Sequence, residues 1–129
     1  MPTPVETIRS FYAALACGDA PAALELMSDD IDWVVMEGWP YKPEGRGPQK
    51  VAEAVFVPLQ QEWTEFKLVP SEYLGDGETV VSIGRFLGVH GLTGKRLNAG
   101  YAHIWDVRDG RIARFRQYAD TLVVDEARK

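Results

Sequence analysis

The chain has few of the residues that bind metals or form disulfides. Among its 129 residues there is one cysteine, Cys17, and there are two histidines, His90 and His103. A single cysteine excludes a disulfide within the chain, and the three residues match no zinc-ligand spacing. We therefore expect neither a metal nor a redox cofactor.

An excess of basic charge and long apolar runs are also missing. The 14 Lys and Arg residues against 19 Asp and Glu residues leave a net charge of -5. Nucleic acids and anionic membranes attract basic surfaces, so neither is an expected partner. No stretch approaches the roughly 18 apolar residues of a membrane span, and the N-terminal residues do not have the pattern of a secretion signal. We expect a cytoplasmic protein that binds small molecules or proteins.

The composition indicates one folded domain over residues 1–129, because 46% of the residues are hydrophobic and no repeat or linker interrupts the chain. Apolar spacing and capping residues predict three helices. They run from Pro4 to about Ala16, from Ala20 to Met27, and from Pro48 to about Trp63, the last kinked or shortened by Pro58.

Five segments have the composition of strands. They are Ile31–Met36, Phe66–Leu74, Thr79–Val89, Arg96–Val107 and Arg111–Leu122, and glycine-containing turns separate the last four. Helices followed by successive antiparallel strands are typical of an α+β fold. We expect the helices to cover one face of a highly curved antiparallel sheet and to enclose a cone-shaped pocket.

The Asp109-Gly110 dipeptide is the strongest hairpin signal in the chain. A two-residue turn there pairs Arg108 with Arg111, and side-chain alternation then divides the hairpin into two faces. The first face carries Asn98, Gly100, Ala102, Ile104, Ala113, Phe115, Gln117 and Ala119. The second carries Tyr101, His103, Trp105, Arg114, Arg116, Tyr118 and Asp120.

Arg85 is unusual because it interrupts an apolar stripe. If Leu92 pairs with Lys95 across the preceding turn, Arg85 lies on the first face near Gln117. A guanidinium there needs a partner or a wet cavity, so Arg85 and Gln117 are candidates for a polar spot in a pocket. Alternatively, Arg85 reaches the rim or pairs with Glu37. A turn of different length would place Phe86 there instead.

The second face has two possible roles. His103 and Asp120 could form an acid–base pair, but aromatic residues beside arginines are more typical of a protein interface. We therefore expect a homodimer through an outer sheet face that carries Tyr101, His103, Trp105, Arg116 and Tyr118.

Other aromatic residues are candidates for the pocket wall. Tyr12 either places a phenol in the cavity or is a core aromatic, and the core role is the more usual one at this spacing. Glu37, Trp39 and Tyr41 follow the first strand, where a cavity mouth is expected. They either contact a ligand or pack within their own loop.

Several short segments, in their order along the chain, resemble the nuclear transport factor 2-like superfamily. These are residues 11–19, 29–33, 109–112 and 116–120, with Gly47 before the third helix. The resemblance covers nearly the whole chain and is greatest to SnoaL-like polyketide cyclases, limonene epoxide hydrolase and ketosteroid isomerases. It implies a helix-covered curved sheet around an apolar pocket, a dimer, and cofactor-independent acid–base chemistry by a buried carboxylate.

This chain departs from that pattern at the catalytic positions. The tyrosine of the isomerases falls on Phe11, their general base near Val35, and their oxyanion-hole acid on Ala102. The last-strand aspartate of the epoxide hydrolase falls on Gln117, and an amide cannot take a proton from water. The family carboxylates are therefore not matched.

Two functions remain open. In the first, the chain is a small-molecule enzyme of isomerase, cyclase or hydrolase type: Arg85 stabilises negative charge, Gln117 orients substrate or water, and Glu37 is the base. The expected substrate-binding residues are Tyr12, Trp33, Trp39, Tyr41, Asn98, Ala102 and Phe115. In the second, the chain is a non-catalytic dimeric module that binds a hydrophobic metabolite or a protein.

Overall fold

The first two helices begin where their capping residues predict. In the computed structural model, which describes residues 2–129, α1 spans Pro4–Ala16 and α2 spans Ala20–Glu25. Thr3 and Glu6 form a reciprocal capping box at the start of α1, with hydrogen bonds of 3.1 and 2.8 Å. Asp19 caps α2 with one hydrogen bond, which its carboxylate accepts from the backbone N–H of Ala22 at 3.1 Å. No described helix is long and apolar enough to cross a membrane.

The third helical segment continues through Pro58 by means of a π-helical turn. It consists of α3 (Pro48–Val51), the π segment η1 (Ala52–Phe56) and α4 (Val57–Glu62). Proline has no N–H and its ring collides with the carbonyl four residues earlier in an α-helix. The wider π turn directly precedes Pro58, and the Val57 N–H bonds to the carbonyl of Ala52 five residues back. The predicted helix from Pro48 to about Trp63 is confirmed.

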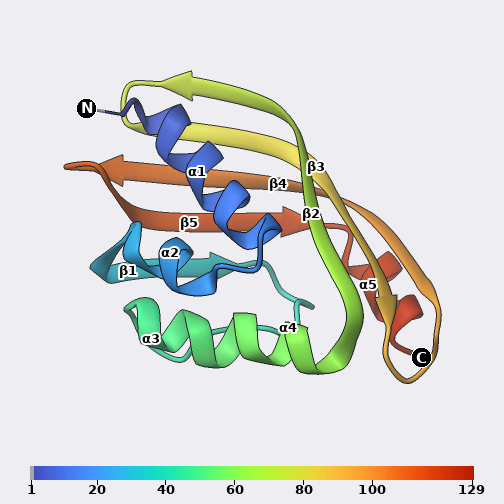
Figure 1. Cartoon of the computed structure of the whole chain (residues 1–129). Coiled ribbons are helices and arrows are strands. Elements are labelled where there is room, and N and C mark those ends of the chain that lie inside the picture. The colour runs from blue at the N-terminus through green and yellow to red at the C-terminus, as the bar shows by residue number, and fades with distance from the viewer. Residues whose placement is uncertain (1) are drawn as a thin grey trace.

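A five-stranded sheet forms the second layer, and the helices α1 to α4 cover its concave face (Figure 1). Its strands are β1 (Met27–Val35), β2 (Trp63–Asp76), β3 (Thr79–His90), β4 (Arg96–Arg108) and β5 (Arg111–Ala119), in the spatial order β1-β5-β4-β3-β2. The last four strands form the expected antiparallel meander, but β1 pairs with β5 in parallel. The sheet is therefore mixed at one edge.

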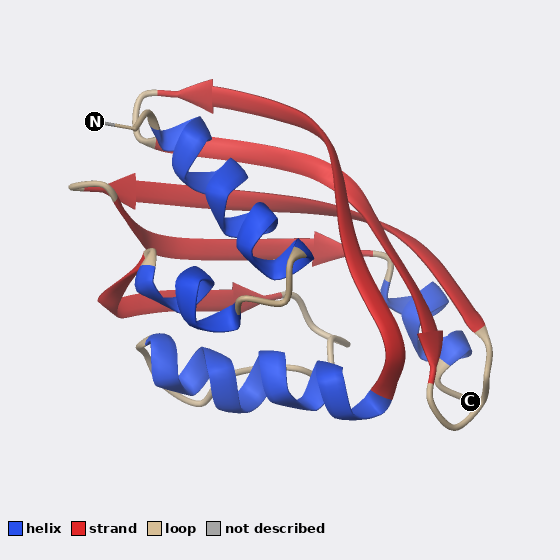
Figure 2. Ribbon diagram, in the orientation of Figure 1, coloured by secondary structure: helices blue, strands red, loops and turns tan. Residues whose placement is uncertain are grey.

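A fifth helix follows the last strand. The sequence predicts a strand as far as Leu122, but β5 ends at Ala119 and α5 spans Thr121–Ala127. Asp120 explains the change, because its carboxylate accepts a hydrogen bond of 3.2 Å from the Val123 N–H and so caps the helix. Figure 2 shows α5 at the far end of the sheet, apart from the other helices.

A β-bulge in the closing hairpin exchanges the two faces predicted for β4. The turn pairs Arg108 with Arg111 as expected, and Val107 lies opposite Ile112. The register then shifts by one residue, because Asp106 lies opposite Arg114 and leaves Ala113 without a partner. Side chains of β4 beyond this point face the opposite way from the prediction. Tyr101, His103 and Trp105 are buried inside the molecule, so their placement on an outer interface was wrong.

The loop between β3 and β4 is longer than predicted, but it leaves Arg85 on the same face of the sheet as Gly100 and Ala102. Val89 pairs with Arg96, and a hydrogen bond of 2.9 Å joins the His90 N–H to the Lys95 carbonyl, so the predicted pairing of Leu92 with Lys95 was wrong. The shift is by two residues, so Arg85 keeps its predicted face. The bulge in the closing hairpin turns this face of β3 and β4 outward, so Arg85 lies on the outer face of the sheet. Phe86 points inward and is buried in the core.

Candidate ligand pocket

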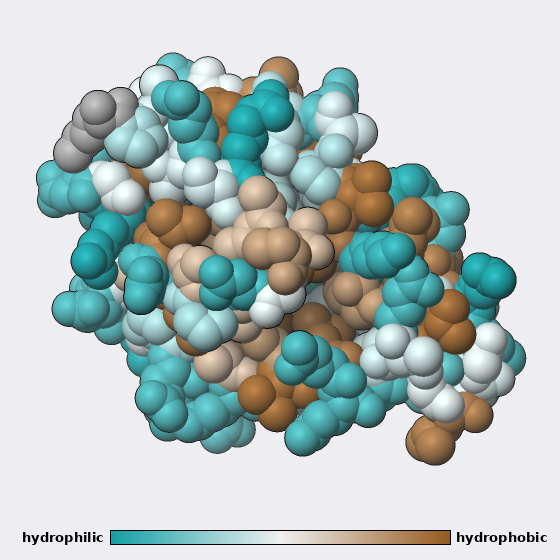
Figure 3. Space-filling model, in the orientation of Figure 1, coloured by the Kyte–Doolittle hydropathy of each residue, from teal (hydrophilic) through white to brown (hydrophobic). Residues whose placement is uncertain are grey.

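A cavity of about 510 Å³ lies between the concave face of the sheet and the helices. The space-filling view shows a hollow on this side of the molecule, bordered by hydrophobic side chains (Figure 3). Its lining comes from α1, α2, η1, α4 and all five strands. The buried part of the lining consists of Phe11, Tyr12, Trp33, Trp39, Val55, Trp63, Phe86, His103, Trp105, Phe115 and Gln117.

Aromatic rings pack against one another around the cavity. Trp33 and Phe115 are stacked with ring centroids 3.8 Å apart, and Trp39 and Phe86 are stacked at 5.3 Å. Trp105 and Phe11 form a T-shaped pair with ring centroids 5.0 Å apart. Packed aromatic rings form a rigid wall with flat surfaces, and such a wall suits a ligand that itself contains rings.

One polar network reaches this apolar wall from within the sheet. The Tyr12 hydroxyl lies 2.6 Å from Ser82 Oγ and 2.6 Å from His103 Nδ1. The indole Nε1 of Trp105 donates to Ser82 Oγ at 2.9 Å. At the other end, His103 Nε2 lies 3.0 Å from Gln117 Oε1. The network therefore links α1 to three neighbouring strands and ends at Gln117 in the cavity wall.

Burial keeps the members of this network uncharged. His103 is 1% exposed, and desolvation lowers its pKa to about 3 although the hydrogen bond to Gln117 acts in the opposite direction. Burial also raises the pKa of Tyr12 far above its ordinary value, and that of the neighbouring Tyr101 to about 12. At neutral pH the imidazole is neutral and both phenols keep their protons.

Charged groups are scarce in the wall. Among the residues that the structure describes, Glu65 is the only carboxylate of the lining, and it is exposed and forms an ion pair of 2.7 Å with Lys67. The wall also holds a donor without an acceptor in the described chain, because Trp33 Nε1 is buried and unpaired. No three His, Cys, Asp or Glu side chains in residues 2–129 are arranged to hold a metal ion.

The residues predicted for the pocket divide into two groups. Tyr12, Trp33, Trp39, Phe115 and Gln117 line the cavity. Asn98 and Ala102 lie on the outer face of β4, because the bulge turns them away from the helices. Tyr41 is buried outside the lining, where its hydroxyl donates to Glu62 at 2.6 Å.

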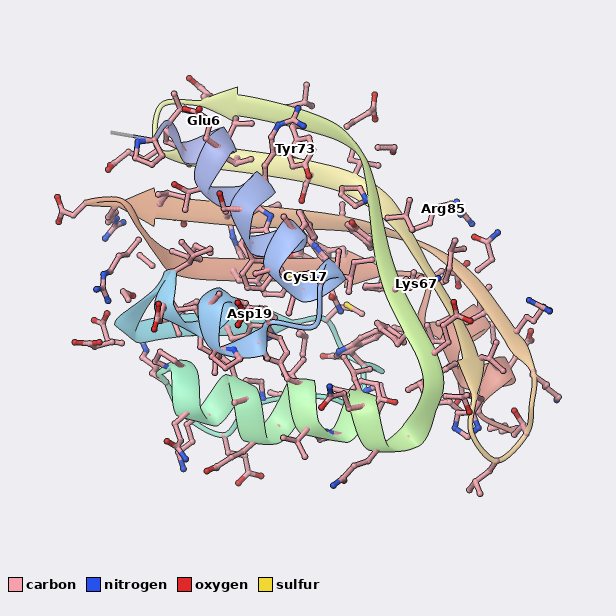
Figure 4. The ribbon with its side chains drawn as sticks, viewed as in Figure 1. Glu6, Cys17, Asp19, Lys67, Tyr73 and Arg85 are labelled. Atoms are coloured by element: carbon pink, nitrogen blue, oxygen red, sulfur yellow. The ribbon has the colours of Figure 1, made fainter. Side chains whose placement is uncertain are left out.

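The two charged residues predicted for catalysis lie outside the cavity. Arg85 extends away from α1 and the other helices (Figure 4), and its guanidinium donates to the Asn98 side chain on the outer face. Glu37 is exposed on the loop after β1. Arg85 therefore cannot stabilise charge in the cavity, and Glu37 cannot act there as a base. Asp120 caps α5, and both ring nitrogens of His103 have other partners, so the acid–base pair of His103 and Asp120 does not form.

The sequence analysis missed the central residues of the network. His103 and Trp105 belong to an alternating stripe, Leu97, Ala99, Tyr101, His103, Trp105 and Val107, whose members are all buried. Alternating positions occupied mainly by aromatic and aliphatic side chains are themselves a sign of a core-facing strand. The inward-facing stripe and the Asp109-Gly110 turn are compatible only if one strand has an extra residue, so together they would have predicted the bulge.

A second polar cluster supports the far end of the sheet. Glu62 accepts hydrogen bonds from Tyr41 at 2.6 Å, from Arg128 at 2.6 and 3.2 Å, and lies 3.2 Å from His90 Nε2. Burial raises the pKa of Glu62, but the bonds from Arg128 and Tyr41 outweigh it and lower this pKa below its usual value. The cluster joins α4, the loop after β1, and the C-terminal residues.

A helix-covered curved sheet around an aromatic cavity defines the class of protein. The family model for the SnoaL-like domain matches residues 8–115, and the chain belongs to this family. The predicted family resemblance and fold are thereby confirmed.

Three similar proteins extend this result. The chain is 30% identical to the uncharacterized protein YesE of Bacillus subtilis (strain 168), over 95% of this chain and 84% of YesE. Its structure is similar to that of an NTF2-like protein from Burkholderia thailandensis E264, with a TM-score of 0.94, 32% identity, and coverage of 100% and 99% of the two chains. It is also similar to TerC co-crystallized with polyporic acid, with a TM-score of 0.86, 27% identity and 98% coverage of both chains.

Proposed function

We propose that this protein binds a mainly apolar, ring-bearing small molecule in the cavity and promotes its isomerisation or cyclisation without a cofactor. The observation that carries the proposal is the buried polar network that ends at Gln117 in a largely aromatic wall. A few polar groups in an apolar cavity are the usual means of orienting a ligand. The similarity to TerC, which was co-crystallized with polyporic acid, supports a small-molecule ligand.

The chemistry follows from the neutral groups of the wall. His103 has a pKa of about 3 and is therefore a weak base, and the one carboxylate of the described lining, Glu65, is exposed and paired with Lys67. We infer that catalysis here depends on hydrogen bonds to a ligand oxygen that gains negative charge in the transition state. Enolisation and ring closure of a carbonyl compound are reactions of this kind, and solvent water takes up and returns the protons, because the described lining holds no buried carboxylate.

The test is a substrate panel of enones and cyclisable polyketide mimics, with calorimetry for binding and steady-state kinetics for turnover. The Gln117→Met variant keeps the volume of the side chain but removes its amide, so we expect binding to weaken roughly three- to ten-fold and turnover to fall at least as much. Gln61→Met is the matched control, because Gln61 is exposed on α4 outside the lining. Equal binding and turnover in Gln117→Met and the native chain would exclude the proposed role of Gln117.

A second candidate is a non-catalytic module that binds the same class of molecule. The favouring observation is that no buried carboxylate belongs to the cavity lining of residues 2–129. The two candidates differ in one outcome of the panel. Binding that depends on Gln117, without turnover of any member, would support the module, whereas turnover lost in Gln117→Met supports the enzyme.

A further inference from the structure

The hydrogen atoms of the buried network have a preferred direction, which begins at Trp105. An indole Nε1 only donates, so Ser82 Oγ accepts from Trp105 and keeps its own hydrogen for another partner. The Tyr12 hydroxyl is the group that can accept it, at 2.6 Å. Tyr12 then donates its hydrogen to His103 Nδ1, also at 2.6 Å. In this arrangement the hydrogens of Trp105 Nε1, Ser82 Oγ and the Tyr12 hydroxyl each have an acceptor.

The opposite direction leaves a buried hydrogen without a partner. If His103 Nδ1 carried a hydrogen, Tyr12 would accept it and donate its own hydrogen to Ser82. Ser82 is 0% exposed, and its own hydrogen would then have no acceptor among the described residues. Because an unmade hydrogen bond is costly in a buried site, the first direction is favoured.

The direction of the network determines which end of the Gln117 amide is free. A neutral His103 that accepts at Nδ1 carries its hydrogen on Nε2 and donates it to Gln117 Oε1 at 3.0 Å. The amide NH₂ then remains, and its one protein contact in the described chain is the Met36 sulfur at 4.0 Å, a weak acceptor. Gln117 is 5% exposed and lines the cavity, so this NH₂ lacks both a strong protein acceptor and bulk water.

We infer that the Trp105–Ser82–Tyr12–His103 network is a positioning device that turns the Gln117 NH₂ toward the ligand, and that the pocket selects molecules with an acceptor oxygen over molecules with a donor N–H at that point. The unpaired Nε1 of Trp33 adds a second donor to the same wall. This inference rests on the proposed binding of ring-bearing molecules in the cavity.

Three rigid tricyclic compounds test the selectivity, because they share one shape and differ at one position. Fluorenone has a carbonyl there, carbazole has an N–H, and fluorene has a methylene group and is the reference. We expect fluorenone to bind roughly three- to ten-fold more tightly than fluorene in calorimetry, and carbazole no more tightly than fluorene. Carbazole binding more tightly than fluorenone would overturn the inference.

The Tyr12→Phe variant tests the positioning role. It removes the hydroxyl that holds the imidazole in one tautomer. The Gln117 amide can then rotate so that its oxygen and its NH₂ exchange positions. We expect the ratio of fluorenone to carbazole affinity, measured within the variant, to fall toward one. Tyr118→Phe is the matched control, because Tyr118 is 55% exposed on the outer face, and it should keep the native ratio. An unchanged ratio in Tyr12→Phe would contradict a positioning role.

The nitrogen NMR spectrum of the His103 imidazole provides a test that needs no ligand. The inference requires a protonated Nε2 and an unprotonated Nδ1 in the native chain, and a mixture of tautomers in Tyr12→Phe. A protonated Nδ1 in the native chain would overturn it. If none of the three compounds binds, the proposed ligand class fails, while the imidazole spectrum still decides the orientation of Gln117.

Discussion

Residue 117 shows how the neighbours of a side chain limit its chemistry. The family resemblance implies a buried carboxylate in the pocket, and the epoxide hydrolases have an aspartate at this position of the last strand. Here the residue is Gln117, and its partner His103 is itself uncharged. An amide can donate and accept at once, so it can connect a buried imidazole to a ligand without placing a charge in the aromatic wall.

The depressed pKa of His103 predicts a specific pH dependence of stability. The folded imidazole has a pKa of about 3, whereas an unfolded histidine has a pKa of about 6.5. As the pH falls between these values, the unfolded chain binds a proton that the folded chain cannot, so the stability falls. We expect His103 to contribute about 1 kcal/mol of this loss per pH unit.

Urea unfolding of the native chain and of His103→Gln at a series of pH values measures this contribution. Glutamine does not titrate, so the free energy of unfolding should fall less steeply on acidification in the variant. The comparison between the two proteins removes the contributions of groups common to both, such as Glu62. Parallel pH profiles would show that His103 is not the group responsible.

Among the elements, the closing hairpin shows what a sequence can reveal and what it conceals. Its turn could be predicted because Asp109 and Gly110 both adopt positive φ angles, which few other residue pairs do readily. The bulge could not be predicted from the turn, because the extra residue, Ala113, has no distinctive chemistry. One unpaired alanine therefore decides which side of β4 faces the cavity.

The C-terminal helix buries Val124 and Ala127 in the core and makes polar contacts with distant elements. Arg128, directly after α5, forms two hydrogen bonds to Glu62 at the end of α4, and Thr93 donates to the Ala127 carbonyl at 2.7 Å. Asp120 begins the helix as its cap. The contacts of Arg128 and Thr93 join residues far apart in the sequence, so the Asp120 cap was the one short-range sign of α5 among these contacts.

Neutralising Glu62 should loosen α5 more than it loosens the pocket. The Glu62→Gln variant loses the charge that binds Arg128, and we expect stability to fall by about 1–3 kcal/mol. Amide hydrogen exchange should rise mainly in α5 and in the loop between β3 and β4. Glu53→Gln is the control, because Glu53 is exposed and accepts one bond from Gln49. Equal exchange in α5 of both variants would contradict this role.

For the whole molecule, the order of helices and strands and the α+β class could be predicted because they depend on local periodicity and on turn residues. The contents of the pocket depend on register, and an error of one residue exchanges the two faces of a strand. The candidate site was therefore half predicted. The residues of α1, β1 and β5 that line the cavity were predicted correctly. For β3 and β4, the face that was predicted to line the cavity is the outer face of the sheet.

The outer face of the sheet remains the proposed dimer interface, with a corrected composition. Arg116 and Tyr118 are on it as predicted, together with Ile83, Ala102 and Ile104 from the neighbouring strands. Ile83 and Tyr118 are large apolar side chains exposed on this face. Apolar side chains that gather on one face are typical of interfaces, so we propose that two copies pair there.

Sedimentation velocity tests this pairing. We expect a dimer at micromolar concentration for the native chain and a monomer for Ile83→Glu, because a buried and unpaired carboxylate is costly at an interface. Leu92→Glu is the control, since Leu92 is 94% exposed on the loop between β3 and β4 and should leave the dimer intact. A native monomer would refute the proposal.

The distribution of tryptophan has an optical consequence. All four tryptophans of the chain, Trp33, Trp39, Trp63 and Trp105, belong to the lining of one cavity. Every indole that emits light in this protein is therefore next to the space where a ligand is proposed to bind. The intrinsic fluorescence of the unlabelled chain should report the filling of that space directly, with no signal from tryptophan elsewhere in the molecule.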